Sequence, residues 1–255
     1  MAPHRLIVHA GFHKTGTTSV QRLLDRHRDT LDAHMQVILR ADMRALCDAA
    51  RRYSVSRDPL DLGFVQYEAA MLADTMTHDT VMLSSEDLSG HMPGRHGLKR
   101  YDAAPEIAVA MAETWAEALP GTDFCLAYTV RDAAPWLASC YVQHLRATRI
   151  TITADHYARE YAASARLLEA VAAVQGALPD VDVRALALEE IGGSRLGPAE
   201  ALLHLADIPD ETLRDLTPVP HANRAMPAEK QEAFLALNRS TLSDADLRAR
   251  KTAIG

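Results

Sequence analysis

Short runs of apolar residues alternate with longer segments of helical periodicity along most of the chain. A short continuous apolar run is typical of a buried strand, whereas apolar positions three and four residues apart are typical of an amphipathic helix. The predicted strands are residues 6–8, 35–40, 81–83, 124–130 and 181–188. The predicted helices are residues 20–24, 43–52, 67–76, 104–119, 132–146, 156–178, 197–206 and 228–237. This alternation predicts one α/β domain spanning residues 1–255, with three layers in which helices flank a central, mainly parallel sheet.

Segments rich in glycine, proline and charge interrupt the pattern and are predicted as loops. Residues 54–63 form one such loop. Residues 90–101 form another, which carries several cations. It is either a lid or acceptor-binding loop, or an ordinary solvated basic loop. Residues 218–227 are a third loop and a candidate to return to a functional site, and a polar tail is expected after residue 237.

Length and composition agree with a single globular domain. A chain of 255 residues, 48% hydrophobic and 24% charged, can bury one substantial core. The net charge of −7 gives no sign of a nucleic-acid partner or of an anionic membrane surface. An anionic ligand must therefore meet local positive charge, for which Lys14, Arg131 and the stretch 95–100 are the candidates.

The cysteines and the apolar runs bear on the compartment. Cys47, Cys125 and Cys140 are odd in number and form no C-x-x-C pair, so neither a disulfide framework nor a structural zinc is expected. No apolar run approaches the length of a membrane span, and the first strand begins almost at Met1, before a signal sequence could fit. The expected location is cytoplasmic.

The most informative stretch is residues 5–24, RLIVHAGFHKTGTTSVQRLL. An apolar strand leads into a loop with Gly11, Lys14 and Gly16 and several hydroxyl side chains, and a helix follows. Strand, glycine-bearing loop and helix together aim backbone N–H groups and a helix N-terminus at one anion. The stretch predicts a phosphate or sulfate cradle for a phosphorylated nucleotide. The alternative is a βα turn in which the glycines only turn the chain.

This loop differs from a Walker A loop, which reads G-x-x-x-x-G-K-[ST]. The spacing from Gly11 to Gly16 fits, but Thr17 stands where the lysine belongs. The loop lysine is Lys14, two residues before the second glycine. This displacement argues against a standard ATPase or kinase.

Residues 13–19, HKTGTTS, resemble the 5′-phosphosulfate-binding loop of the sulfotransferase family, which commonly reads P-K-[ST]-G-T-T. Members use 3′-phosphoadenosine 5′-phosphosulfate (PAPS) as donor and release adenosine 3′,5′-bisphosphate. His13 replaces the usual proline, and Ser19 stands where cytosolic members often have tryptophan. The resemblance implies a P-loop-like sulfotransferase fold and metal-independent chemistry. It assigns donor binding to His13, Lys14, Thr15, Gly16, Thr17 and Thr18.

A second segment resembles the family's 3′-phosphate site, where an arginine follows a strand and a serine comes eight residues later. Arg131 and Ser139 have this spacing after the strand 124–130. A guanidinium suits the role because it donates two parallel hydrogen bonds to phosphate oxygens. The family's proline two residues after the arginine is Ala133 here, and the proline is Pro135. The alternative is that Arg131 pairs with a carboxylate or caps a helix.

Polar residues follow the strand 81–83 at once. Ligands of open parallel sheets lie beyond the carboxyl ends of the strands, so Glu86 is expected on the same edge as Lys14. It is the first candidate for the general base that takes the acceptor's proton. Certain carbohydrate sulfotransferases use a glutamate near this position and cytosolic ones use a histidine, which makes His91 the second candidate. Alternatively, Glu86 or Asp87 caps the next turn.

The function that this resemblance implies is transfer of a sulfuryl group from PAPS to a hydroxyl or amine of a small-molecule or glycan acceptor. The acceptor is not identified, and a carbohydrate-like compound is one candidate. Two alternatives stay open: a kinase-like or other nucleotide enzyme with a displaced lysine, and a non-catalytic nucleotide-binding protein. The pair Arg250-Lys251 is the nearest match to the family's C-terminal hold on the 3′-phosphate, but it lacks the rest of that pattern. The sequence does not predict the oligomeric state.

Overall fold

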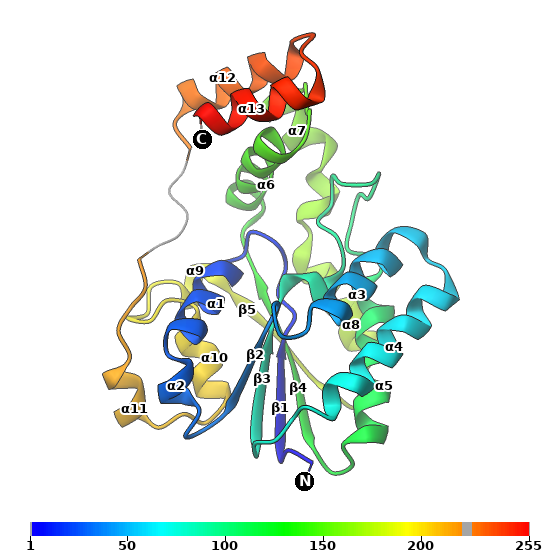
Figure 1. Cartoon of the computed structure of the whole chain (residues 1–255), viewed down its shortest axis with the longest axis vertical. Helices are drawn as coiled ribbons and strands as arrows, with labels where there is room; N and C mark the ends of the chain where they lie inside the picture. Colours follow the sequence, from blue (N-terminus) through cyan, green and yellow to red (C-terminus); the bar gives the residue numbers. More distant parts are fainter. Residues whose placement is uncertain (1, 221–225, 255) are drawn as a thin grey trace.

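A computed structural model describes residues 2–220 and 226–254, and in these residues five strands form one sheet (Figure 1). The strand order is β2-β3-β1-β4-β5, and every neighbouring pair is parallel. The strands are β1 (Arg5–His9), β2 (Gln36–Leu39), β3 (Thr80–Ser84), β4 (Asp123–Val130) and β5 (Asp182–Ala187). Each lies where an apolar run predicts it, so the α/β prediction is confirmed, and the described sheet is entirely rather than mainly parallel.

Helices cover both faces of the sheet and give three layers. Successive strand residues point to opposite faces, so Leu6 and Val8 of β1 join one apolar cluster and Ile7 joins the other. The face to which Ile7 points is covered by α1 (Thr17–Arg26), α2 (Arg28–Leu31), α10 (Ala199–Leu205) and α11 (Asp210–Asp215). The opposite face is covered by α3 (Arg44–Ser56), α4 (Pro59–Ala73), α5 (Ala104–Ala118) and α8 (Leu167–Ala177).

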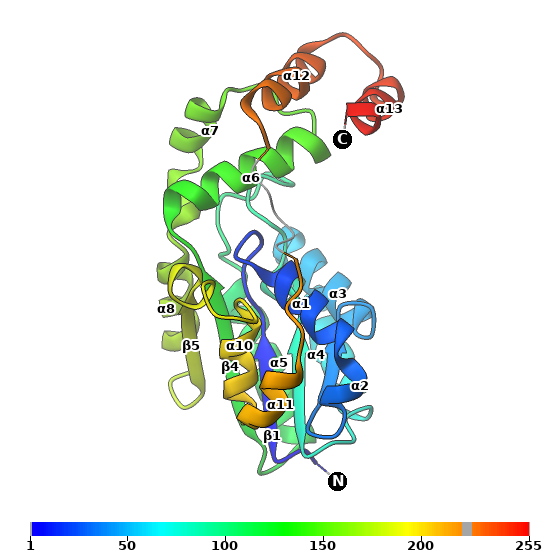
Figure 2. The ribbon, with the colours of Figure 1, turned by 90° about the vertical axis from the view of Figure 1, so that its left-hand side faces the viewer.

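Four further helices stand beyond the carboxyl edge of the sheet, which is the upper edge in Figures 1 and 2. They are α6 (Ala133–Ala147), α7 (Ala154–Glu160), α12 (Ala228–Arg239) and α13 (Asp244–Ile254). Three short elements complete the described chain: η1 (Glu86–Ser89), η2 (Ala162–Ala165) and α9 (Leu188–Ile191). In the described part of the chain, no helix combines the length and the apolar character that crossing a membrane requires.

The predicted loop at residues 54–63 is wrong, because most of it is helical. Helix α3 runs on to Ser56, and Arg57 ends it with a left-handed φ of 56°. Helix α4 then begins at Pro59, where the Asp58 side chain accepts a hydrogen bond from the Leu60 N–H at 2.9 Å. An aspartate followed by proline is a helix start, since the carboxylate caps the first turn and proline needs no acceptor there.

The single long helix predicted for residues 156–178 is also wrong. The chain forms α7, η2 and α8 in turn. Ser164 in η2 is buried and donates a hydrogen bond to the carbonyl of Lys99. This contact ties η2 to the loop that carries Lys99.

The polar segment after residue 237 forms α13, a helix that the sequence analysis did not predict. Ser243 precedes the helix, accepts a hydrogen bond from the Asp246 N–H at 3.2 Å and donates one to the Asp246 carboxylate at 2.6 Å. A serine N-cap of this kind starts a helix even where the apolar pattern is weak. By contrast, Asp132 stands before α6 as predicted, but its side chain makes no capping hydrogen bond.

Candidate active site

The loop between β1 and α1 turns sharply at two residues with left-handed backbone. Gly16 has φ 96° and precedes the first residue of α1, and Lys14 has φ 68°. The positive φ favours glycine at Gly16, and a Cβ atom there would also lie 2.9 Å from the Leu188 side chain, which would have to shift. Gly11 is enclosed as well, since its Cβ would meet the Thr129 hydroxyl at 2.5 Å.

The backbone of this loop presents a row of free donors. Among the described residues, no acceptor lies within hydrogen-bond reach of the N–H groups of residues 14–18. The next N–H group, that of Ser19, bonds the Gly16 carbonyl at 2.9 Å and begins the helical pattern. A row of free N–H groups at the N-terminus of a helix is an anion-binding arrangement, because the helix dipole adds to the donors.

The loop threonines have different roles. Thr15 is fully buried, and its hydroxyl donates to the Phe12 carbonyl at 2.5 Å and bonds the Thr129 hydroxyl at 2.7 Å. Its side chain therefore holds the loop against β4, which leaves only its N–H group for a ligand. Thr17 is also buried and Thr18 is exposed, and both line the cavity described below.

Lys14 reaches across the site to α6. Its Nζ donates a hydrogen bond to Oε1 of Gln143 at 3.2 Å. Burial lowers the pKa of Lys14; the positive charges of Arg146 and Arg131 add to this effect, and the negative charge of Glu86 opposes it. The ammonium group is thus half-buried among cations, where an added anion would stabilise it.

Arg131 lies beside Lys14, because β4 is the neighbour of β1 and both strands end at this edge. Its Nη1 donates to the Lys14 carbonyl at 3.3 Å. Among the described residues, no carboxylate forms an ion pair with Arg131 and no partner bonds the hydroxyl of Ser139. Ser139 lies one helical turn before Gln143 on α6, which puts it on the same side of that helix. Arg131 and Ser139 do not bond one another.

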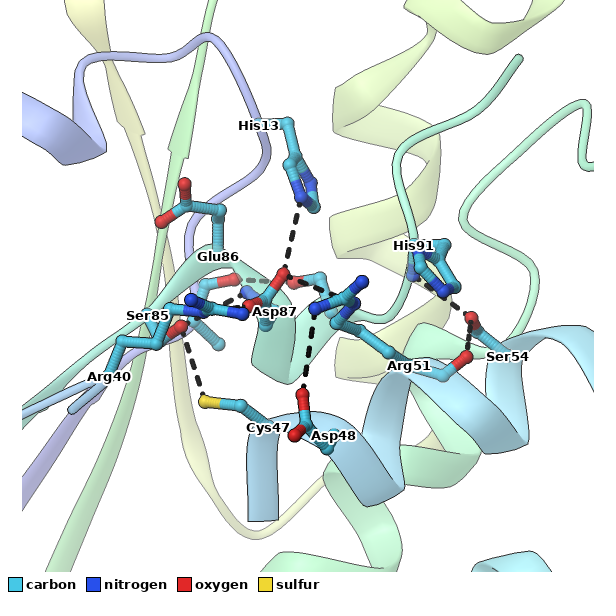
Figure 3. Close-up of polar contacts among 12 residues, drawn as sticks. His13, Arg40, Cys47, Asp48, Arg51, Ser54, Ser85, Glu86, Asp87 and His91 are labelled. Carbon is cyan, nitrogen blue, oxygen red and sulfur yellow. Dashed lines mark hydrogen bonds and ion pairs between the residues drawn. The ribbon is translucent and has the colours of Figure 1, made fainter. Parts of the chain in front are cut away.

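Glu86 lies on the predicted edge, since β3 runs parallel to β1 on its other side. It is the first residue of η1, and its Oε2 accepts a hydrogen bond from Nε2 of Gln21 at 2.8 Å. The cap of η1 is Ser85, whose hydroxyl accepts from the Asp87 N–H at 3.2 Å. Neither Glu86 nor Asp87 therefore caps this turn, and Figure 3 shows the Glu86 carboxylate turned away from that of Asp87.

One cavity of ≈ 200 Å³ joins the cradle loop, Lys14 and Glu86, whereas Arg131 and Ser139 are not among its lining residues. It is lined by His13, Lys14, Gly16, Thr17, Thr18, Glu86, Met92, Arg95 and Gln143. The sequence analysis does not predict that Gln143 lines this site, and it includes Arg95 only as part of the basic stretch 95–100. Their contacts bring together segments that are far apart in the sequence. A larger cavity of ≈ 390 Å³ lies near Leu6 and Trp115, at the edge opposite to the one where open α/β sheets bind their ligands.

The structure does not bring His91 into this cavity. Its N–H donates to the Ser54 hydroxyl at 2.9 Å, and its ring packs on His96 with centroids 4.7 Å apart. It lines a separate cavity of ≈ 290 Å³ between α3 and the 90–101 loop. Burial, with the charge of Arg51 and other cations, lowers the pKa of His91 to about 4.

His13 and Asp87 belong to a polar cluster that the sequence did not predict (Figure 3). Asp87 pairs with His13 at 3.5 Å, with Arg51 at 3.8 Å and with Arg40. Burial alone would raise the pKa of Asp87, but hydrogen bonds from His13 and Arg40 outweigh it and hold the value at about 2. The His13 Nδ1 also contacts the Tyr101 hydroxyl at 3.1 Å. The His13 ring thus faces this cluster, at the rim of the cavity.

The C-terminal cations lie elsewhere. Nζ of Lys251 donates to the carbonyls of Leu145 and Thr148 at 2.7 Å each and to that of Arg146 at 3.4 Å, so it caps the end of α6. This role leaves Lys251 no free donor for the cradle. The centre of the 218–227 loop, residues 221–225, lies outside the described residues. In residues 2–220 and 226–254, no three His, Cys, Asp or Glu side chains gather so as to hold a metal ion.

Comparisons with known proteins give limited likeness. No protein-family model matches the chain, and a search among curated proteins finds no match. A sulfotransferase from Alicyclobacillus acidocaldarius superposes with TM-score 0.49 and 17% identity over 99% of this chain and 96% of its own. A structure from the PezAT chromosomal toxin-antitoxin system of Streptococcus pneumoniae gives TM-score 0.30 and 10% identity, over 98% and 87%. Likeness at these levels assigns no activity.

Proposed function

We propose that this protein is a sulfotransferase that uses PAPS and acts on a hydroxyl or amine of a small-molecule or glycan acceptor. The observation that carries the proposal is the row of free N–H groups at residues 14–18, with Lys14 and Arg131 beside it. A nucleotide with negative charge at both its 5′ and 3′ ends matches two cations that arrive from adjacent strands. The match of residues 13–19 to the phosphosulfate-binding loop supports the same donor.

The donor supplies a sulfuryl group, whose S–O bond to the 5′-phosphate breaks as a new bond from sulfur to the acceptor oxygen or nitrogen forms. The N–H groups of residues 14–18 hold the 5′-phosphate. Lys14 neutralises the charge on the oxygen that leaves with the nucleotide. Its half-buried position strengthens this effect, because charges interact more strongly away from water.

Glu86 acts as the general base and takes the proton that the acceptor loses. It shares the cavity with Lys14, and its hydrogen bond from Gln21 fixes the carboxylate at the cavity wall. Arg131 and Ser139 hold the 3′-phosphate and so favour this nucleotide over ATP. His91 is not assigned as the base here, since it lines another cavity.

A thermal-shift comparison tests the proposal with three ligands: adenosine 3′,5′-bisphosphate, AMP, and ATP with Mg²⁺. A ligand that binds only the folded protein raises its Tm, so the order of the shifts reports the order of affinities. We expect the bisphosphate to give the largest shift. A larger shift with ATP and Mg²⁺ would instead favour a kinase-like enzyme. Tight binding of PAPS without transfer to any acceptor would favour a nucleotide-binding protein.

A further inference from the structure

Two adjacent residues of α6 contact the two loops that line the cavity. Gln143 bonds the Lys14 ammonium on the cradle side. His144 is buried and packs against the 90–101 loop, where a Cβ atom at Gly94 would lie only 2.4 Å from its Cε1. Gly94 has φ 91°, and its N–H donates to the Leu98 carbonyl at 2.8 Å. The loop is therefore closed by its own hydrogen bond and packs against α6. Arg95 directly follows Gly94, the residue that contacts His144.

The guanidinium of Arg95 has no hydrogen-bond partner among the described residues. It lines the cavity that also contains Lys14 and Glu86. Its Nε atom is buried, and among the described residues it has no hydrogen-bond partner and Arg95 forms no ion pair. A guanidinium with neither a hydrogen bond nor a carboxylate partner has donors to spare, so an anion bound in the cavity that Arg95 lines would give it acceptors.

We propose that Arg95 is a further catalytic residue, which binds the oxygens of the sulfuryl group during its transfer. This inference rests on the proposed function. The cradle and Glu86 form two walls of one small cavity, so the group that passes from donor to acceptor must lie between them. Arg95 lines that same space, on a loop that α6 fixes in place.

The chemistry of the group explains the choice of arginine. Charge in the transition state is spread over the peripheral oxygens of the transferred group, as in phosphoryl transfer. A guanidinium presents several donors in a plane and stays charged, so it can contact more than one of these oxygens. Lys14 and Arg95 then divide the charge, with one at the leaving oxygen and the other at the transferred group.

A comparison of two ligands isolates this contact, because PAPS and adenosine 3′,5′-bisphosphate differ only by the sulfuryl group. Calorimetry would measure both affinities in the wild-type protein and in Arg95→Ala. We expect the variant to weaken PAPS binding about tenfold more than bisphosphate binding. Arg100→Ala is the matched control, since Arg100 lies on the same loop, is exposed and lines other cavities. It should change neither affinity.

The outcomes of this experiment separate the role of Arg95 from the proposed function. Equal losses for both ligands in Arg95→Ala would overturn the role of Arg95 and leave the proposed function standing. Failure of the wild-type protein to bind either ligand would overturn both. Arg95→Lys keeps the charge but removes the planar set of guanidinium donors, so it should lose part of the PAPS-specific affinity. If thermal unfolding shows that Arg95→Ala does not fold, Arg95→Lys takes its place in the comparison of PAPS with the bisphosphate.

Discussion

Replacing Arg131 by alanine separates recognition of the 3′-phosphate from general charge attraction. The guanidinium has one hydrogen bond in the described structure, to the Lys14 carbonyl at 3.3 Å, and no carboxylate partner there. Removing it therefore removes one hydrogen bond to a neutral acceptor, which lowers the free energy of unfolding by about 1 kcal/mol. For a chain of this size that is a fall in Tm of roughly 2–4 °C.

The expected loss in binding is larger than the loss in stability. Two hydrogen bonds from a guanidinium to a phosphate contribute about 3 kcal/mol together, which is about a hundredfold in the dissociation constant. The dissociation constant of adenosine 3′,5′-bisphosphate should rise by this factor. AMP has no 3′-phosphate and should lose little, since only the weak long-range attraction of Arg131 is removed.

Calorimetric titration of both nucleotides is the assay, with Arg146→Ala as the control. Arg146 is exposed on α6, yet its charge lowers the pKa of Lys14, so it acts on the site only through its long-range field. Its removal should weaken the binding of both nucleotides by the same small factor. Equal losses for the bisphosphate and AMP in Arg131→Ala would refute a 3′-phosphate site at this residue.

Three further predictions test the cradle and the cluster beside it. Lys14→Ala should lower the release of adenosine 3′,5′-bisphosphate from PAPS at least about 100-fold while the Tm changes little, and near-normal turnover would contradict its role. Gly16→Ala should lower the Tm more than Gly97→Ala, because both have positive φ but only the former meets a side chain, that of Leu188 at 2.9 Å; equal shifts would contradict the close approach. The pKa of Asp87 is lowered from 3.8 to about 2, so its contribution of about 2 kcal/mol is present above pH 4 and lost as the pH falls towards 2. Acid titration of Asp87→Asn should show a smaller loss of stability in that window, and an unchanged loss would exclude the pairing.

The sequence predicts the strands well, and it predicts the loop between the first strand and the first helix, because both depend on local signals. Buried parallel strands are short apolar runs between turns, and each of the five was recognisable without knowledge of its neighbours. The parallel order then puts the ends of β1, β3 and β4 together, which is why Lys14, Glu86 and Arg131 were predicted on one edge. Their roles in binding and catalysis remain predictions.

The remaining features depend on contacts between distant segments. His91 follows Glu86 closely in the sequence, yet Gly90 with φ 83° turns the chain and Ser54 of α3 holds the His91 N–H, so the two candidates face different cavities. The ion pairs of Asp87 with Arg40 and Arg51 join three elements, and no periodicity in the sequence signals them. Such contacts become visible only when the elements are packed.

The position of α6 explains how a site made of loops can be precise. Nε1 of Trp136 donates to the His13 carbonyl at 2.8 Å, Gln143 bonds Lys14, and His144 seats Gly94. One helix therefore contacts both the cradle loop and the 90–101 loop. Substrate groups held by loops need such support, because small displacements weaken transition-state contacts strongly. A displacement of α6 should therefore disturb the cradle loop and the 90–101 loop together, whereas a change within either loop should disturb that loop alone.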